Sequence, residues 1–334
     1  MSSVLSLRMT MLLTLALYIG ITSLALALIL SLLGLNIIFI AILITVFHVI
    51  QWLIAPYVIE SIYHVRELGE DEYPWLHRML EDIVSRAKIK FKPKLMLAEI
   101  SIPNAFAYGS PLTGPRVAVT RGLIENLHRE EIRAVLGHEV GHLKHKDVQL
   151  MLFISLLPAL FFIIGRYLMW SLLWGGIGDR RDRGGGIALA IVLAIACYAI
   201  YIVLLLIMLR YSRLREYFAD YEAAINVPDG AKKLAAALVR IASVTGRLSK
   251  HTKSIVMKSS TFKALLISDP ENDVLEGLTL RYGDDWRRDY QLALSLAYRE
   301  EGGEEELFST HPSLVKRIRA LIELDKELSS RAIY

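Results

Sequence analysis

Long apolar segments with almost no charged residues recur in the first two thirds of the chain. The first runs from residue 9 to residue 59 without a single Asp, Glu, Lys or Arg. Crossing the hydrocarbon core of a bilayer takes about 20 apolar residues, so this block predicts two transmembrane helices joined by a turn near residues 33–36. Residues 148–174, interrupted only by Arg166, and residues 184–209 predict two more. The pattern therefore predicts four transmembrane helices.

A cleaved signal peptide and a buried helical hairpin fit these segments less well than transmembrane helices do. The first apolar block is much longer than the h-region of a signal peptide, which has about 7–15 residues, and a second span follows it with little break. A helical hairpin buried inside a soluble protein usually keeps one polar face. Residues 184–209 contain no charged residue that would form such a face.

Polar residues concentrate in two regions, 60–147 and 210–334. Apolar positions at helical spacing, and alternation in shorter runs, predict the elements inside these regions. The predicted helices cover residues 73–87, 123–146, 210–226, 231–245 and 312–329, and the predicted strands cover residues 94–102 and 116–120. Residues 247–306 are mixed in character, become acidic towards their end, and predict no function.

The placement of Lys and Arg near the apolar segments predicts the orientation in the membrane, because cytoplasmic loops carry an excess of both. The side that holds the two polar regions has six basic residues close to the spans: Arg66, Lys144, Lys146, Arg210, Arg213 and Arg215. On the opposite side, three arginines in the loop near residues 173–185 are partly balanced by Asp179 and Asp182. We therefore expect both polar regions on the cytoplasmic side.

The composition agrees with a membrane protein, and it excludes an intramolecular disulfide and nucleic-acid binding. Hydrophobic residues make up 54% of the chain and charged residues 22%, and the mean hydropathy is +0.42. The single cysteine, Cys197, excludes an intramolecular disulfide. The net charge of +4 is not arranged in a basic run with interleaved aromatic residues, so we exclude nucleic-acid binding. Basic residues next to the spans instead predict contact with anionic membrane lipid.

The run His138-Glu139-Val140-Gly141-His142 has the form HExxH. Positions i and i+4 of a helix lie above one another on one face, so the two imidazoles are placed to bind one zinc ion at about 2.0–2.1 Å. Glu139 lies one step round the helix, where its carboxylate accepts the proton of a zinc-bound water. The motif therefore predicts hydrolysis of a peptide bond, with Glu139 as the base.

A catalytic zinc normally has three protein ligands and a fourth position for water. His145 lies on the same helix face as His138, but it stands about 10 Å further along the axis, too far for one straight helix to bring all three imidazoles to one ion. Glu216 precedes Asp220 by four residues on a predicted helix, and a carboxylate ligand with a second carboxylate that orients an imidazole is a common arrangement. Taken alone, such a pair is more often an ordinary solvated helix face.

Four runs of sequence resemble the HtpX-type membrane zinc metallopeptidases, which are relatives of the CAAX prenyl endopeptidases. These runs are Val117–Ile124, His138–Asp147, Ser212–Asp220 and Ser309–Pro312. The similarity covers most of the chain, including two spans before HExxH and two between this motif and Glu216. The resemblance implies that Glu216 is the third zinc ligand and that Asp220 lies behind it.

The same resemblance implies further site residues. The segment Asn104-Ala105-Phe106-Ala107 matches the family's NAFA motif, which lies in an edge strand near the substrate cleft, so Asn104, Ala105 and Phe106 are expected to bind substrate. His311 and Arg317 match an HP-x-x-x-x-R pattern that the relatives place near the reacting carbonyl. Tyr108 departs from the family, in which a small or polar residue is common at this position. Residues 247–306 match the family poorly.

These observations predict a mostly α integral membrane protein with a cytoplasmic, zincin-like α+β metallopeptidase domain. Residues 1–59 are expected to hold two transmembrane helices, and residues 60–147 the first part of the catalytic domain with the HEVGH helix. Residues 148–209 are expected to form a transmembrane hairpin. Residues 210–334 are expected to form the second part of the catalytic domain, with the third zinc ligand and C-terminal helices.

The predicted function is that of a zinc-dependent endopeptidase of the cell membrane, with membrane lipid and protein substrates as partners. The resemblance implies membrane or misfolded proteins as substrates and a role in protein quality control. A CAAX-type prenyl endopeptidase is the first alternative, but those relatives have more spans around a closed chamber. A non-catalytic membrane scaffold with a zinc site is the second, but a merely structural site has no use for the base Glu139.

Overall fold

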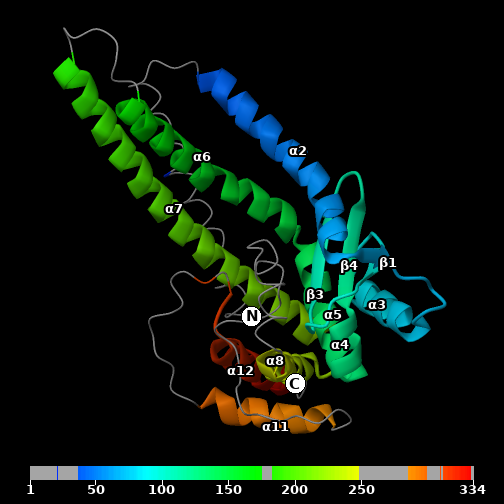
Figure 1. Cartoon of the computed structure of the whole chain (residues 1–334). Coiled ribbons are helices and arrows are strands. Elements are labelled where there is room, and N and C mark those ends of the chain that lie inside the picture. Colours follow the sequence, from blue (N-terminus) through cyan, green and yellow to red (C-terminus); the bar gives the residue numbers. More distant parts are fainter. Residues whose placement is uncertain are drawn as a thin grey trace. The chain divides into compact units, whose positions relative to one another are not determined.

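The computed structural model describes residues 37–174, 183–247, 285–298 and 311–331, together with Ile21 and Ser309. The chain divides into two compact units, whose elements are labelled in Figure 1. One unit contains residues 1–52 and 149–214, and the other contains residues 53–148 and 215–334. Each unit is therefore assembled from two separate stretches of the chain.

The unit with residues 149–214 is built from long apolar helices. α2 (Ile37–Tyr63) begins in this unit, and α6 (Asp147–Trp174) and α7 (Arg183–Asn226) supply most of the remainder. The predicted span 184–209 and the predicted helix 210–226 are one continuous helix, α7. The core between α6 and α7 is formed by apolar side chains that include Ile154, Phe161, Leu168, Ala194, Cys197 and Leu204.

Large apolar side chains also cover the outer faces of these helices. Trp170, Val192 and Ile195 are each more than 60% exposed, and such exposed apolar surface marks contact with lipid or with another protein. Among the described residues, one helical segment, Ile187–Asn226, is long and apolar enough to cross a membrane. The apolar part of α6, Leu157–Trp170, is shorter. Apart from Ile21, the first predicted span lies outside the described residues, so the number four stays a prediction.

The second unit contains a four-stranded sheet, formed by β1 (Val65–Glu67), β2 (Lys94–Ala98), β3 (Ala105–Ser110) and β4 (Gly114–Thr120). The strand order is β1-β2-β4-β3, so β3 is an edge strand. β2 and β4 are parallel, and the other pairs are antiparallel. In the β3–β4 pair, Phe106 lies opposite Ala118 and Ala107 lies opposite Val117.

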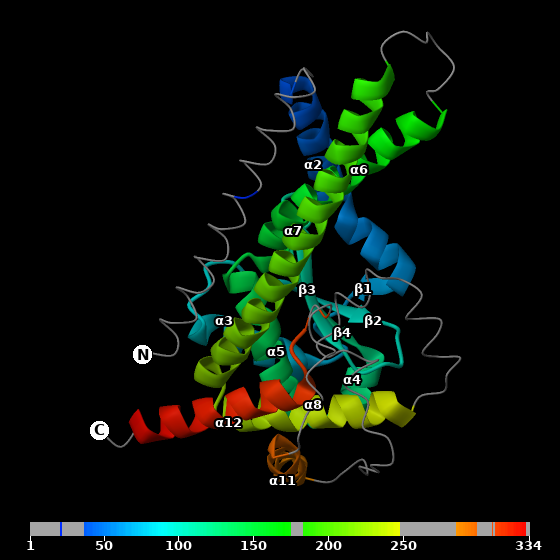
Figure 2. The ribbon, with the colours of Figure 1, turned by 90° about the vertical axis from the view of Figure 1, so that its left-hand side faces the viewer.

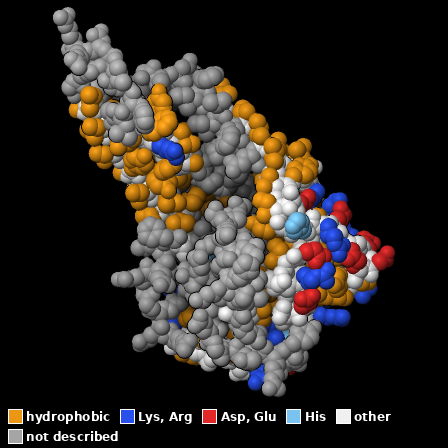
Figure 3. Space-filling model, viewed as in Figure 1, with side chains coloured by type: hydrophobic (Ala, Val, Ile, Leu, Met, Phe, Trp, Pro, Cys, Tyr) orange, Lys and Arg blue, Asp and Glu red, His pale blue; other side chains and the backbone are white. Residues whose placement is uncertain are grey.

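Among the described residues, the second unit also contains six shorter helices: α3 (Pro74–Arg86), α4 (Arg121–Asn126), α5 (Arg129–Lys144), α8 (Gly230–Arg247), α11 (Trp286–Ala297) and α12 (Leu314–Arg331). Both α11 and α12 pack against α8, and Figure 2 shows α12 running beside α8. One core joins these helices to the sheet, with Leu97, Val119, Val135, Leu238 and Ile318 among its buried members. Charged side chains gather near α3, whereas hydrophobic side chains cover the visible parts of α2, α6 and α7 (Figure 3).

Two predicted elements are corrected by the structure. The single helix predicted for residues 123–146 is wrong, because α4 and α5 are separated at Leu127–His128, where both residues have extended backbone conformations. The backbone N–H of His128 donates a 2.8 Å hydrogen bond to the Glu131 carboxylate, which starts α5 as a new helix. The strand predicted for residues 94–102 ends at Ala98, after which the chain turns towards β3.

α5 and the end of α7 pack unusually closely because two glycines of α5 face small residues of α7. A Cβ atom added at Gly141 would lie 3.2 Å from Ala219 Cα, and one added at Gly137 would lie 3.3 Å from Ala223 Cα and 2.8 Å from Val227 Cγ2. Close approach of two helix backbones requires such small residues. This contact brings the HExxH run on α5 next to Glu216 on α7.

Candidate metal centre and active site

Three of the predicted site residues meet inside the second unit. His138 and His142 project from consecutive turns of α5, and Glu216 projects from α7. His138 Nε2 lies 3.1 Å from His142 Nε2 and 3.5 Å from Glu216 Oε2, and His142 Nε2 lies 3.6 Å from Glu216 Oε1. His138 and Glu216 are almost completely buried, and His142 is partly buried.

A second pair of contacts orients the two imidazoles from behind. His138 Nδ1 lies 2.8 Å from Asp220 Oδ1, and His142 Nδ1 lies 2.7 Å from Asp147 Oδ2. An imidazole that gives its Nδ1 proton to a carboxylate presents an unprotonated Nε2 on its other side. Nε2 of each imidazole and the Glu216 carboxylate therefore face the same small volume.

These positions fit a tetrahedral divalent cation. Zinc bonds of about 2.0–2.1 Å in tetrahedral geometry keep neighbouring ligand atoms about 3.3–3.4 Å apart. The Nε2–Nε2 separation of 3.1 Å and the distances of 3.5 and 3.6 Å from each Nε2 to its nearer Glu216 oxygen lie close to this value. Taken with one atom from each residue, the three ligand atoms lie within 4.8 Å of one another. With two nitrogens and one carboxylate oxygen, the fourth tetrahedral position is left for water or substrate, as in catalytic zinc sites.

The electrostatics of the group also favour a positive charge at its centre. Burial by itself lowers the pKa of His138, but the carboxylates of Asp220 and Glu216 outweigh this effect and raise it to about 9. Burial by itself raises the pKa of Glu216, but His311, His138 and His142 together hold it well below its ordinary value. The site is thus built to keep Glu216 ionised and to attract a proton or a metal ion.

Glu139 is buried beside this group. Its side chain is removed from solvent, and this burial raises its pKa above the ordinary value, although His138 and His142 oppose the shift. The backbone N–H of Ala107, on β3, donates a hydrogen bond to the Glu139 carboxylate. A carboxylate whose pKa is shifted towards neutrality is suited to accept and return a proton.

The register of β3 against β4 explains why backbone groups of the edge strand β3 face Glu139. Thr120 N donates to Asn104 O at 2.9 Å, and in an antiparallel pair such bonded positions alternate along the strand. The N–H and C=O groups of Ala105 and Ala107 therefore point away from β4. The side chain of Phe106 instead packs under the sheet with Tyr108 and Met96.

Tyr108, the departure from the family pattern, lies in that same cluster. It is 2% exposed, and its hydroxyl donates a 2.9 Å hydrogen bond to Glu60 near the end of α2. Arg116 on β4 forms an ion pair with the same carboxylate. The side chain of Tyr108 therefore ties β3 to α2 in the core.

Arg317 and His311 also lie at the centre, but in different relations to it. Arg317 forms two hydrogen bonds with Asp220, of 3.0 and 2.5 Å, and its Nη1 lies 3.7 Å from Glu216 Oε2. Arg317 thus contacts two carboxylates: that of Asp220, which holds His138, and that of Glu216, which faces the Nε2 atom of His138. His311 is buried and lies near enough to Glu216 to lower the pKa of that carboxyl.

His145 does not join the group. Its Nε2 lies 3.0 Å from Glu222 Oε1, and its ring packs edge-on against Phe218 with 4.4 Å between ring centroids. Lys144 donates to the other oxygen of Glu222 at 2.8 Å. These contacts fasten the end of α5 to α7.

Sequence reasoning did not single out Asp147 or the backbone of Ala107. Asp147 follows His142 by five residues, across the end of α5, so helical periodicity does not connect the two. The contact of Ala107 with Glu139 uses a backbone group, which no side-chain pattern reveals.

A second cluster of possible ligands, formed by His128, Glu131 and Asp289, already contains a cation. The Arg240 guanidinium lies 2.5 Å from Asp289 Oδ2, 3.4 Å from Glu131 Oε2 and 3.3 Å from His128 Nε2. Arg240 thus supplies one positive charge to the two buried carboxylates, and burial, together with the nearby Asp289, raises the pKa of Glu131 to about 8.

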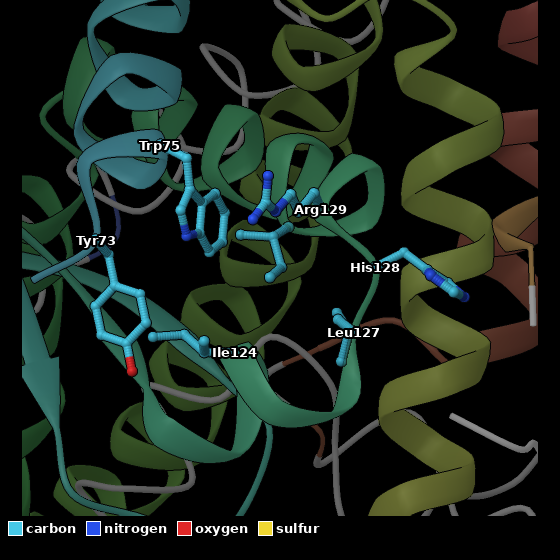
Figure 4. Close-up of a pocket in the computed structure, with 7 residues that line it drawn as sticks. Tyr73, Trp75, Ile124, Leu127, His128 and Arg129 are labelled. Atoms are coloured by element: carbon cyan, nitrogen blue, oxygen red, sulfur yellow. The ribbon is translucent and has the colours of Figure 1, made fainter. Parts of the chain in front are cut away.

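A hollow of about 410 Å³ lies at the beginning of α5. Its lining residues are Tyr73, Trp75, Ile124, Leu127, His128, Arg129 and Ile132. Figure 4 shows Trp75 near Arg129, whose guanidinium carbon lies 4.8 Å from the centroid of the indole. None of these residues belongs to the group around His138.

Comparison with known proteins identifies the family. Residues 70–325 match the model of peptidase family M48. The chain belongs to this family. Two relatives, each described as a protease HtpX homolog, come from Thermoplasma acidophilum and Aeropyrum pernix. The first is 36% identical over 302 residues, covering 87% of this chain and 89% of the relative. The second is 41% identical over 284 residues, covering 82% of each.

One solved structure, the crystal structure of S. mikatae Ste24p, has a similar fold, with a TM-score of 0.50 and 20% identity. The alignment covers 94% of this chain but only 65% of Ste24p. As an M48 peptidase with HtpX homologues, the chain is a membrane-bound metalloprotease that hydrolyses peptide bonds. The predicted family and enzyme class are confirmed.

The geometry leads to a prediction that separates the two candidates for the third ligand. Glu216→Ala should abolish tight zinc binding and proteolysis, because it removes one of three converging groups. His145→Ala should retain most of both, because His145 contacts Glu222 and not the centre. Zinc content after dialysis, measured by mass spectrometry on folded protein, checks this. A metal-free His145→Ala protein would contradict it.

Proposed function

We propose that the chain is a zinc-dependent endopeptidase whose metal is held by His138, His142 and Glu216. The observation that carries the proposal is the convergence of the two Nε2 atoms, 3.1 Å apart, on the Glu216 carboxylate, whose Oε2 lies 3.5 Å from His138 and whose Oε1 lies 3.6 Å from His142. The presence of a carboxylate behind each imidazole supports it. A zinc ion bound there would supply Lewis-acid chemistry, lowering the pKa of water and polarising a peptide carbonyl.

Glu139 is the proposed general base. Its buried carboxylate, with a raised pKa, accepts a proton from the attacking water and gives it to the leaving amine. The N–H of Ala107 holds the carboxylate in place while its protonation changes. Because Glu139 is next to His138 in the sequence, the helix that places the ligand also places the base.

The edge of β3 is the proposed substrate site. An extended peptide adds to a sheet edge through main-chain hydrogen bonds. The backbone groups of Ala105 and the C=O of Ala107 are directed at that edge, while the N–H of Ala107 is bonded to Glu139. Since Ala107 also contacts Glu139, a peptide on this edge would lie beside the base. Asn104, which immediately precedes the strand, is buried and its backbone is held by Thr120. We assign Phe106 a packing role and not a direct contact with substrate.

Arg317 is proposed to position the metal site, since it holds Asp220 and Asp220 holds His138. The resemblance places His311 and Arg317 near the reacting carbonyl. For His311, its proximity to Glu216 supports this role. For Arg317, the hydrogen bonds to Asp220 favour an indirect role, in which it positions Asp220 and does not contact the carbonyl.

We further propose that the chain crosses the cell membrane four times, with residues 60–147 and 210–334 forming the catalytic domain on the cytoplasmic side. The exposed apolar faces of α2, α6 and α7 support membrane contact, and the placement of Lys and Arg supports the orientation. In this arrangement residues 1–59 supply two spans and residues 148–209 supply a hairpin.

The proposed substrates are membrane or misfolded proteins, which corresponds to a role in protein quality control. The fold shared with Ste24p gives some support to a CAAX-type prenyl endopeptidase. The relatives described as HtpX homologs are closer, at 30–41% identity against 20%, and favour the first role.

The base assignment predicts that Glu139→Gln retains zinc and loses peptide hydrolysis by at least about 100-fold, because an amide cannot accept the proton. Digestion of casein by detergent-purified protein, with metal content measured in parallel, checks this. Glu70→Gln, an exposed residue, is the matched control and should behave as wild type. Loss of the metal together with activity in a folded Glu139→Gln protein would refute the assignment.

The topology predicts which side of the membrane each segment faces. In a chain whose Cys197 is replaced by alanine, cysteines at Ser85 and Ser329 should react only with reagent applied from the cytoplasmic side. A cysteine at Gly178, which lies outside the described residues, should react from the other side. If Gly178 and Ser85 are labelled from the same face, residues 148–209 do not span the membrane.

The place of cleavage follows from the short distance between Glu216 and the apolar part of α7. Glu216 follows Arg210, the first charge after that part, by six residues, or about 9 Å along the helix. The metal should then lie outside the hydrocarbon, so that cuts fall in cytoplasmic loops, tails or unfolded segments. Mass spectrometry of fragments from a membrane-protein substrate checks this. Cuts clustered in the middle of apolar spans would point to an intramembrane protease instead.

A further inference from the structure

We propose that Asp147 is a positioning residue of the metal site: it orients the imidazole of His142 for metal binding and thereby fastens this ligand to the first residue of α6. The inference rests on the proposed zinc site. It adds a residue that neither HExxH nor the Glu216–Asp220 pair contains.

The contact is short and buried. Asp147 Oδ2 lies 2.7 Å from His142 Nδ1, and Asp147 is 4% exposed. A buried carboxylate is costly unless a hydrogen-bonded or charged partner compensates it. His142 is such a partner, and the contact leaves Nε2 of the same ring directed at His138 and Glu216.

The backbone between α5 and α6 explains how a residue outside α5 reaches His142. α5 ends at Lys144, and α6 begins at Asp147. Lys146 has a φ of 55°, in the left-handed region, a conformation that commonly ends a helix and changes the direction of the chain. This turn brings the first side chain of α6 back beside the last turn of α5.

Asp147 and Asp220 make equivalent contacts from different helices. Asp220 holds Nδ1 of His138 from α7, and Asp147 holds Nδ1 of His142 from the start of α6. α6 and α7 are the two helices of the predicted transmembrane hairpin. Asp147 and Asp220 lie outside that hairpin, which covers residues 148–209, and both belong to the second unit. Each of the two helices therefore supplies one carboxylate to one ligating imidazole.

A carboxylate in the first turn of a helix can also interact favourably with the helix dipole. Two substitutions separate this role from the contact with His142. Asp147→Asn and Asp147→Ser both remove the charge, and so remove the interaction with the dipole to the same extent. Only Asn keeps an oxygen where Oδ2 lies and is able to accept the Nδ1 proton.

The experiment measures zinc affinity by competition with a chromophoric chelator. It uses the full chain in detergent with Glu139→Gln as the parent, which prevents self-cleavage. Loss of a partner of this kind weakens metal binding by about 10–100-fold, and we expect a loss in this range for Asp147→Ser. Asp147→Asn should lose clearly less. The melting temperatures of the two variants in chelator should agree, which shows that both fold equally well.

Two further variants separate failure of this inference from failure of the proposed function. Asp71→Ser, at an exposed position, should bind zinc as the parent does. Glu216→Ala should lose zinc binding altogether. If Glu216→Ala loses zinc while Asp147→Ser binds as tightly as the parent, the role of Asp147 is refuted and the zinc site stands. Equal losses in Asp147→Ser and Asp147→Asn would assign the effect to the helix dipole and also refute it. If Glu216→Ala binds zinc like the parent, the proposed site itself is wrong.

Discussion

The site depends on one electrostatic constraint: two imidazole nitrogens and a carboxylate are held together in the protein interior, where like-charged or lone-pair-bearing groups repel strongly. Such an arrangement is stable only if a positive charge lies between the groups. The lowered pKa of Glu216 and the raised pKa of His138 both reflect this preference for a positive charge. A divalent cation satisfies it, and the same cation would provide the chemistry of a metalloprotease.

The packing of the second unit keeps these groups in place. Gly137 and Gly141 allow α5 to approach α7 closely, and without that approach Glu216 would not reach the two histidines. Carboxylates behind the imidazoles then define which nitrogen faces the centre. Arg317 extends this set of contacts to α12 through Asp220. The geometry of three atoms is thus determined by helices that are far apart in the sequence.

In the buried cluster around Arg240, the carboxylates are partly compensated by a side chain of the protein itself. There, a guanidinium from α8 lies against both Glu131 and Asp289, and the result is a contact that joins α5, α8 and α11. The cluster around His138 contains no central guanidinium among the described residues: Arg317 approaches from the side of Asp220, with its nearest contact to Glu216 at 3.7 Å. One cluster supplies its own cation, and the other has the ligand atoms and spacing that suit a metal ion.

The sequence by itself predicted the HExxH ligands, the base, the apolar helices and the family, and of these the comparisons confirm the family. Each of these is encoded locally, by a spacing of four residues or by an unbroken apolar run. Resemblance was needed for Glu216, because a Glu-x-x-x-Asp pair on a helix carries little information alone. The break at Leu127–His128 was missed, since the apolar spacing continues across it while a capping hydrogen bond interrupts the helix. Only the tertiary structure decided that Asp147 faces His142, that Ala107 contacts Glu139 and that Arg317 holds Asp220. These contacts join separate elements through a left-handed turn, a backbone group and a buried ion pair, and none of the three leaves a periodic signal in the sequence.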